Sequence, residues 1–355
     1  RAAGDAARAF ELALTAAAVE ERRGALRSAI ERYRKLAEAA PDHPKAPQTH
    51  LQAAWATARL AGAQSEEYIE LLKEHLRCWP KANTADDARL WLGRAHQARS
   101  EWEAAAALYR EVRPEAAGHA EAVQHLHVCV QRVLQQMRAD KKPYEEFARS
   151  AIEHFDQLVT GEEGRWPDRL TAAQREAVVA AGSLRLEYVS GAEAAAEQQL
   201  RPAVKLTDGS TASWQSAVRV LLVRSLVGQE KFDAAKEEVG RAADAVRQWK
   251  TWADKRSGDA RAQRTYGELL LAIGDAEALR LALERWRFVE RRTPPGATEW
   301  FRAKYWIAIC HERLGDKQQA ARVVTVLAEL HPELGGPALK GKFESLRKRC
   351  EQIRD

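Results

Sequence analysis

Two stretches of the 355-residue chain combine residue types that perform chemistry in other proteins. The first runs from Gly336 to Lys342 and has the glycine and lysine spacing of a phosphate-binding loop. Such a loop also needs a buried strand before it and a Ser or Thr after the lysine, whereas Phe343 follows here and the preceding pattern is helical. We therefore expect a Gly-Pro break that begins a helix, whose Phe343 and Leu346 cover the apolar end of the preceding helices.

The second stretch holds His125, His127 and Cys129. On a helix, His125 and Cys129 share a face while His127 points away, so a metal site would need a further ligand from another helix. The four cysteines of the chain lie far apart with no CxxC pair, which gives no support to a zinc or redox motif. We expect Cys129 to be a core residue, and we predict a non-catalytic protein with no metal and no cofactor.

Tryptophan is abundant, with 11 in the chain. Trp249 and Trp252 follow an apolar stripe on a helix expected at 231–256, which overruns an ordinary repeat helix by about ten residues. Basic residues interleave with these two rings: Arg247, Lys250, Lys255 and Arg256. Two interpretations remain open. In the first, this overhang packs on the next hairpin or on the connection at 204–210. In the second, it is a docking surface for an acidic protein segment, which is favoured over a nucleic acid or a lipid surface.

The elements that must position these residues are helical. Ala, Leu, Glu, Arg and Gln dominate the composition, while Gly and Pro number only 20 and 12, too few for a chain of many tight β-turns. Apolar residues recur at three- and four-residue spacing in segments of about 14 to 20 residues, separated by short polar breaks. The expected helices are 2–22, 24–40, 45–61, 65–78, 84–98, 101–113, 117–139, 143–159, 171–189, 191–203, 212–228, 231–256, 260–273, 275–292, 298–314, 316–331 and 337–353.

Several of these helix pairs share an order of residue sizes. Residues 301–332 show this order in full. They contain a large-small pair (Ile307-Ala308), a tight turn (Gly315-Asp316), a small residue (Ala320), a large residue (Val324) and a closing proline (Pro332). Residues 86–114, 216–245 and 260–294 repeat much of this order. The order resembles that of the tetratricopeptide repeats of bacterial helical-repeat proteins. This resemblance implies an all-α fold, a right-handed superhelical solenoid of about eight helix hairpins with a C-terminal capping helix.

The resemblance is uneven along the chain. We predict a single solenoid with four parts: N-terminal repeats in 1–116, degenerate repeats with longer loops in 117–210, C-terminal repeats in 211–335 and a capping helix in 336–355. The connections at 160–170 and 204–210 are longer than a tight turn. An alternative is two shorter solenoids hinged near residue 165.

In the tetratricopeptide family, the first helices of successive repeats line a concave groove where peptides bind. For the matched repeats of this chain, the resemblance implies exposed first-helix residues that would contact a partner: Trp91, Arg94, Arg224, Arg264, Glu268, Arg302, Tyr305 and Trp306. Basic side chains beside aromatic rings suit an acidic or carboxylate-bearing peptide. The Lys and Asn set of members that bind chaperone tails is not present, so the resemblance does not indicate that partner.

Charge and hydropathy limit which other classes of function are possible. Lys and Arg number 56 against 51 Asp and Glu, which gives a net charge of +5 and a pI near 9.0, with the excess in the second half. The sequence has no run of about 18 apolar residues that could span a membrane. We predict a non-catalytic scaffold that binds a peptide or protein segment. The alternatives are a helical-repeat RNA-binding protein that uses the basic C-terminal half, and the soluble scaffold region of a larger cell-envelope assembly protein.

The sequence gives weaker evidence about the partner and about the cellular compartment. A nucleic-acid groove usually concentrates more positive charge on one face, so a protein or peptide partner, such as an acidic one, is favoured over RNA. The absence of paired cysteines slightly favours the cytoplasm. The chain begins with Arg1 rather than Met, so we expect a truncated or processed form, and export remains an alternative.

Overall fold

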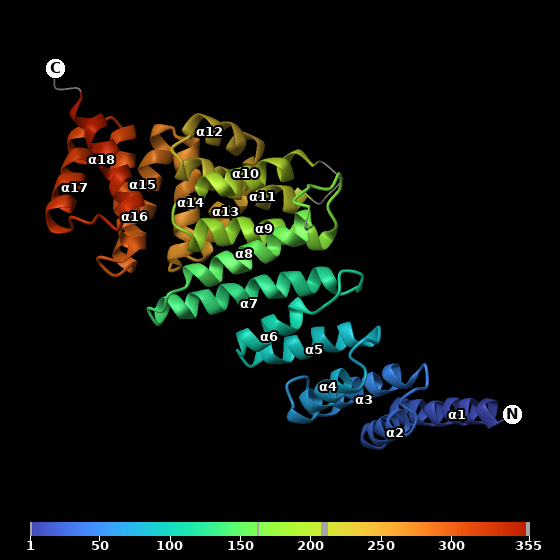
Figure 1. Ribbon diagram of the computed structural model, residues 1–355. Helices are drawn as coiled ribbons and strands as arrows, with labels where there is room; N and C mark the ends of the chain where they lie inside the picture. The colour runs from blue at the N-terminus through green and yellow to red at the C-terminus, as the bar shows by residue number, and fades with distance from the viewer. Residues whose placement is uncertain (1, 162, 207–211, 353–355) are drawn as a thin grey trace. The chain divides into compact units, whose positions relative to one another are not determined.

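The computed structural model describes residues 2–161, 163–206 and 212–352, and every regular element in these ranges is an α-helix (Figure 1). In chain order they are α1 (Ala2–Arg22), α2 (Leu26–Ala39), α3 (Ala46–Ala61), α4 (Glu66–Cys78), α5 (Thr84–Ala98), α6 (Trp102–Arg110), α7 (His119–Ala139), α8 (Glu145–Thr160), α9 (Ala172–Tyr188), α10 (Glu193–Lys205), α11 (Ala212–Gly228), α12 (Phe232–Arg241), α13 (Ala243–Lys255), α14 (Ala260–Ile273), α15 (Ala276–Arg292), α16 (Thr298–Arg313), α17 (Lys317–Leu330) and α18 (Pro337–Glu351). The predicted all-α helical-repeat fold is confirmed. Within the described part, no helix combines the length and apolar character that a bilayer crossing requires.

Helix ends follow local signals in the sequence. The Ser65 hydroxyl accepts the backbone N–H of Tyr68 (3.3 Å) at the start of α4, and the Asp275 carboxylate accepts that of Ala278 (2.8 Å) at the start of α15. Gly274, which ends α14, has a φ of 73°, a left-handed conformation that glycine adopts without strain. Polar caps and a terminal glycine therefore set these boundaries.

One expected helix is interrupted. The prediction of a continuous helix at 231–256 is wrong, because the backbone leaves the helical conformation at Ala242, with φ of −118° and ψ of 26°. Gly240 lies in the last turn before the break and weakens the helix there. The break allows both α12 and α13 to pack on α14, which a straight helix of that length would not do.

The chain forms two compact units. The first comprises Arg1–Tyr144 with Ala172–Ala177, and the second comprises Glu145–Thr171 with Val178–Asp355. The division into N-terminal, degenerate and C-terminal repeats stays a prediction, as does the alternative of two hinged solenoids, because compactness does not define repeat type. Part of the long connection expected at 204–210 lies outside the described residues.

In the first unit, consecutive helices pack side by side from α1 to α7. Their close approach depends on small residues, since a Cβ on Gly93 of α5 would lie 2.6 Å from the Tyr109 ring of α6. Tyr109 is buried and its hydroxyl donates to Gln97 Oε1 (2.9 Å), so the ring has little room to move aside. A glycine beside Leu92 is therefore required for α5 and α6 to pack.

In the second unit the same arrangement pairs α14 with α15. A Cβ on Gly267 would lie 2.9 Å from Nε1 of the buried Trp286. The C-terminal helix α18 packs on α16 and α17, and its Phe343 and Leu346 are fully buried, as predicted. The Phe343 ring lies edge-on to the Tyr305 ring of α16, with centroids 5.2 Å apart. Apolar burial therefore fixes α18 on the helices before it.

Two fully buried histidines lie next to each other in the first unit. His50 of α3 and His75 of α4 have ring centroids 5.6 Å apart, and both pack against the Trp79 ring. His75 Nε2 lies 3.0 Å from Thr84 Oγ1, and His50 Nε2 lies 3.6 Å from the Glu74 carboxylate. Burial lowers the pKa of His75 to about 4 and also lowers the pKa of His50, so both rings are neutral near pH 7.

We expect Gly93→Ala to lower the free energy of unfolding by about 1–3 kcal/mol, because the added methyl group overlaps the Tyr109 ring. Gly341→Ala is the matched control. Its site within α18 has open space for a Cβ, and the substitution should raise the free energy of unfolding by about 0.5–1 kcal/mol. Urea denaturation followed by circular dichroism measures both. A Gly93→Ala protein as stable as the wild type would show that this close approach is not needed.

The buried histidines predict a loss of stability in mild acid. Unfolded histidines take up protons below pH 6.5, whereas folded His75 stays neutral down to about pH 4. The stability that depends on the neutral rings is therefore complete above pH 6.5 and is lost as the pH falls toward 4. Denaturation between pH 7.5 and 4.5 should show a smaller loss for His75→Gln, which cannot titrate. An equal loss of stability in the wild type and in His75→Gln would show that the neutral His75 ring is not the cause of the acid sensitivity.

Candidate partner-binding site

Six of the eight predicted partner-binding residues lie in the second unit and line one cavity of about 50 Å³, which we call the inner cavity. They are Arg224 of α11, Arg264 and Glu268 of α14, and Arg302, Tyr305 and Trp306 of α16. The other lining residues were not predicted: Leu186, Glu193, Gly228, Trp286, Leu339 and Lys342. The structure thus brings together side chains that the sequence places on three separate helices.

Helical spacing explains how each helix contributes. Residues 302, 305 and 306 are separated by three and four positions, so they share one face of α16. Residues 264 and 268 share one face of α14 by the same rule. Because α11 packs on α14, the face of α11 that carries Arg224 meets the face that carries Glu268, and these two side chains form an ion pair.

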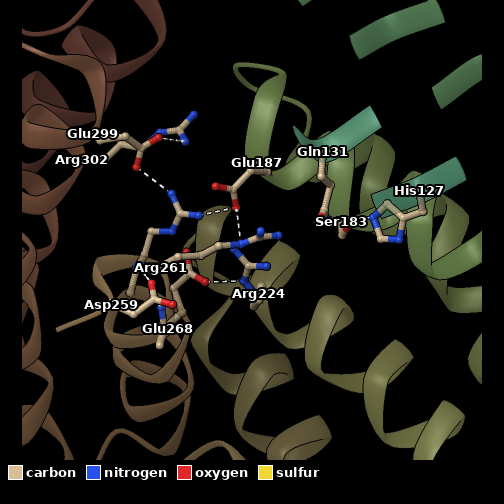
Figure 2. A network of polar contacts seen from close by, with 12 residues as sticks. His127, Gln131, Ser183, Glu187, Arg224, Asp259, Arg261, Glu268, Glu299 and Arg302 are labelled. Atoms are coloured by element: carbon tan, nitrogen blue, oxygen red, sulfur yellow. Dashed lines mark hydrogen bonds and ion pairs between the residues drawn. The ribbon is translucent and has the colours of Figure 1, made fainter. Parts of the chain in front are cut away.

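The inner cavity borders a network of buried ion pairs (Figure 2). Arg264 donates through Nη2 to the Glu187 carboxylate of α9, and through Nη1 to Glu299 Oε2 of α16 (2.7 Å). Arg302 donates to the other oxygen of Glu299 (3.0 Å), and Arg261 Nε lies 3.6 Å from Glu187. One guanidinium group therefore links carboxylates on two different helices to α14.

Burial shows that the predicted exposure of this face is wrong. Exposed fractions are only 8% for Arg224, 6% for Arg264, 1% for Tyr305 and 6% for Trp306. The physical reason is contact across repeats. Arg264 reaches back to α9, and the Tyr305 hydroxyl donates to Glu230 in the turn between α11 and α12. The binding of a partner by these residues stays a prediction.

Electrostatics keep the network ionised. Burial alone would raise the pKa of Glu187, but the guanidinium groups of Arg264, Arg261 and Arg224 hold this pKa well below its usual range. The carboxylates of Glu187 and Glu299 in turn raise the pKa of Arg264, against the effect of its burial. The charges are thus mutually dependent, and removing one of them leaves a buried partner uncompensated.

Two buried donors beside the inner cavity make no hydrogen bond within the described part of the protein. They are Arg264 Nε and Trp286 Nε1. A buried N–H group without an acceptor is unfavourable. An acceptor that enters the inner cavity, from water or from a ligand, could therefore gain a hydrogen bond.

A second pocket of about 110 Å³, which we call the outer pocket, shares Glu193, Arg302, Leu339 and Lys342 with the inner cavity. Its remaining lining comes from loops and from the first residues of α16 and α18: Ser190, Gly191, Thr298, Gly335, Gly336, Pro337 and Ala338. Arg302 and Lys342 are partly exposed, with 20% and 28% of their side-chain surface accessible. The outer pocket thus combines two accessible cations with the N-terminal end of a helix, which carries partial positive charge.

Lys342 ends the stretch whose glycine and lysine spacing is that of a nucleotide motif. Its Nζ donates to the Gly228 carbonyl (2.6 Å) and lies 3.7 Å from the Glu193 carboxylate. The spacing at 336–342 gave no sign that this lysine lies beside Arg302. The Gly-Pro break does begin α18, as predicted, with Pro337 in its first turn.

Trp91 and Arg94 belong to the first compact unit and do not line either pocket. Trp91 is half-buried against the core around Leu72 and Leu92. Arg94 is exposed and forms an ion pair with Glu121 of α7. Their role in partner binding stays a prediction for a separate surface.

Trp249 and Trp252 lie on α13 and pack against each other, with ring centroids 4.7 Å apart. The Arg256 guanidinium stacks on Trp252 at 4.8 Å, and Lys250 pairs with Asp254 of the same helix. Because α13 packs on α14 and α11, the helix that carries both rings belongs to the stack. These contacts favour the interpretation in which this segment packs on the next hairpin, while a docking role stays a prediction.

The His125 and Cys129 region has the character of a packed core. Cys129 is fully buried, which raises the pKa of its thiol to about 12, and the His125 ring stacks on Tyr109 at 5.3 Å. Nowhere in the described ranges do three or more His, Cys, Asp or Glu side chains gather closely enough to hold a metal ion.

Comparison with known proteins agrees with this architecture. Residues 302–333 match the family model of the tetratricopeptide repeat. This match places one tetratricopeptide repeat on α16 and α17, within a helical-repeat fold of stacked helix hairpins. No curated protein sequence matches the chain.

The solved structures similar to this chain include three of low sequence identity. A tetratricopeptide repeat protein from Parabacteroides merdae is 12% identical, with 97% of this chain and 99% of that chain covered, at a TM-score of 0.33. The tetratricopeptide domain of P58(IPK) is 16% identical, with 97% and 88% covered, at 0.30. The structure of residues 1–338 of Acl4, the assembly chaperone of RpL4, is 13% identical, with 86% of this chain and 97% of that chain covered, at a TM-score of 0.30.

Removal of the central arginine should destabilise the protein strongly. We expect Arg264→Met to lower the free energy of unfolding by about 3–5 kcal/mol, because Glu187 and Glu299 both lose a buried counter-charge in direct contact with them. The double variant Arg264→Met with Glu187→Met should recover part of that loss, since it removes both charges. Chemical denaturation of the three proteins tests this. A single variant within about 0.5 kcal/mol of the wild type would contradict the proposed network.

Proposed function

We propose that the protein is a non-catalytic scaffold for protein–protein interaction, and that its second unit binds a carboxylate group of a partner segment in the outer pocket. The tetratricopeptide-like fold supports a role in protein binding. The observation that carries the finer proposal is the gathering of Arg302, Lys342 and the first turn of α18 around one small opening.

The two cations of the outer pocket are only partly committed to other groups. Lys342 donates one hydrogen bond, to the Gly228 carbonyl (2.6 Å), and lies 3.7 Å from the Glu193 carboxylate. Arg302 uses Nη1 for Glu299. Their remaining donors can form charge-assisted hydrogen bonds with an incoming carboxylate. The unpaired backbone N–H groups in the first turn of α18 add partial positive charge at the same place.

The size of the outer pocket limits what can enter. Its volume is about 110 Å³, which is small beside the roughly 300–1,000 Å³ of sites that take drug-sized ligands. A carboxylate on a short side chain is small enough to enter it. The proposed ligand is therefore a single Asp or Glu side chain, or a chain terminus, that anchors a partner segment. An extended peptide lying along a wide groove fits this unit less well.

A nucleic-acid backbone matches the site less well than a carboxylate does. Arg224 and Arg264 already neutralise buried carboxylates, so they are not available to successive phosphates. Polyanion binding depends on several accessible cations in a row. We therefore favour a protein partner over RNA.

The test removes the charges of the two cations of the outer pocket and keeps the ion pairs of Arg264 with Glu187 and Glu299. In the double variant Arg302→Gln with Lys342→Gln, recovery of a partner by affinity capture from the source cells should fall at least tenfold, because two charge-assisted hydrogen bonds are lost. Arg264 and Tyr305 are unsuitable for this test, because both are buried and their replacement would destabilise the fold.

The matched control is Arg322→Gln with Lys348→Gln, which removes one arginine and one lysine from positions on α17 and α18 of the same unit that line neither pocket. This control variant should recover as much partner as the wild type does.

A second experiment uses peptides. The acidic segment of the captured partner is synthesised, together with a form in which each Asp and Glu is replaced by its amide. Equal recovery by the two double variants, or equal binding of the two peptides, would overturn the proposal.

A further inference from the structure

Glu193 is the only acidic residue among the described residues that line the outer pocket. It also lines the inner cavity, so its side chain belongs to both. The other charged groups of the outer pocket, Arg302 and Lys342, are cations. A carboxylate of the protein itself therefore lies in the pocket that we propose for the carboxylate of a partner.

Two features of the chain place Glu193 there. It is the first residue of α10, where the partial positive charge of the helix end favours a carboxylate. Its side chain packs closely on the last residue of α11, because a Cβ on Gly228 would lie only 2.5 Å from Glu193 Cγ. The glycine at 228 thus lets the Glu193 side chain lie against the end of α11 and reach toward Lys342.

The carboxylate of Glu193 faces Lys342 without forming a hydrogen bond to it. Glu193 Oε1 lies 3.7 Å from Lys342 Nζ, whereas the same Nζ donates to the Gly228 carbonyl at 2.6 Å. Both side chains are partly exposed, with 24% of Glu193 and 28% of Lys342 accessible. An ion pair of this length and exposure is weak, so an incoming carboxylate can compete for the same ammonium group.

We propose that Glu193 is an internal competitor in the outer pocket, whose carboxylate pairs with Lys342 until the carboxylate of a partner takes its place. This inference rests on the proposed function, since it concerns the same ligand group in the same pocket. When the partner binds, Lys342 pairs with the ligand, and the two carboxylates then lie near each other. Like charges that are this close repel each other.

The consequence is selectivity among carboxylates. A free small acid makes contact with the pocket alone, and the repulsion from Glu193 offsets much of that contact. A partner segment makes further contacts outside the pocket, which compensate for the repulsion. Glu193 therefore weakens the binding of all carboxylates and so favours a protein segment over the small acids that surround it.

The test uses the full chain and a defined probe, N-acetyl-aspartate methylamide, whose carboxylate lies on one methylene carbon. Titration calorimetry at low ionic strength measures its dissociation constant. Glu193→Gln keeps the size of the side chain and removes its charge, so the probe should bind this variant more tightly than the wild type, by roughly threefold or more.

Glu277→Gln is the matched control. Glu277 is also an acidic residue in the first turn of a helix, α15, but it is exposed and lines neither pocket. Its replacement should leave the affinity for the probe unchanged. An equal gain in the two variants would overturn the proposal, because the effect would then follow from net charge alone.

A double-mutant cycle shows whether Glu193 acts through Lys342. In a Lys342→Gln background, Glu193→Gln should give a much smaller gain in affinity, because the ammonium group for which the two carboxylates compete is gone. The same gain with and without Lys342 would overturn the proposal, and so would the absence of any gain in the wild-type background. Thermal denaturation confirms that each variant folds.

The same titrations separate this inference from the proposed function. If the wild type binds the probe, if Arg302→Gln with Lys342→Gln abolishes that binding and if Glu193→Gln gives no gain, the carboxylate site is supported and the internal competitor is wrong. If neither the wild type nor Glu193→Gln binds the probe, the carboxylate site is wrong as well.

Discussion

The buried guanidinium group of Arg264 is the contact on which the second unit depends most. It joins a carboxylate on α9 and a carboxylate on α16 to α14, so helices from different hairpins are held by one side chain. Each of these charges would destabilise the fold if it were buried alone, and together they satisfy one another. The network also withdraws Arg224 and Arg264 from solvent, which leaves Arg302 and Lys342 as the accessible cations at the rim.

This constraint distinguishes the pockets of the two units. In the second unit, the first helices of the hairpins bury most of their shared face, and the two pockets described there are small. In the first unit, α2, α3 and α4 line an open groove of about 790 Å³.

The sequence predicted what depends on neighbours within a hairpin. Most helix bounds and the burial of Phe343 follow from local periodicity and from the residues that begin and end a helix, and the structure contains them. Contacts between hairpins were not predictable, because the curvature of the stack decides whether Arg264 reaches Glu187, which is 77 positions away. The size order of the repeats placed arginines on the correct helix faces but gave no information about their burial.

The most direct test of the central claim is the chemical accessibility of the arginines. Phenylglyoxal modifies exposed guanidinium groups, and peptide mapping by mass spectrometry gives a rate for each site. If Arg264 is buried between two carboxylates, its rate should be at least tenfold below that of the exposed Arg247, with Arg224 similarly protected. If Arg264 is modified as fast as Arg247, this face is open to solvent and the buried network does not hold the second unit together.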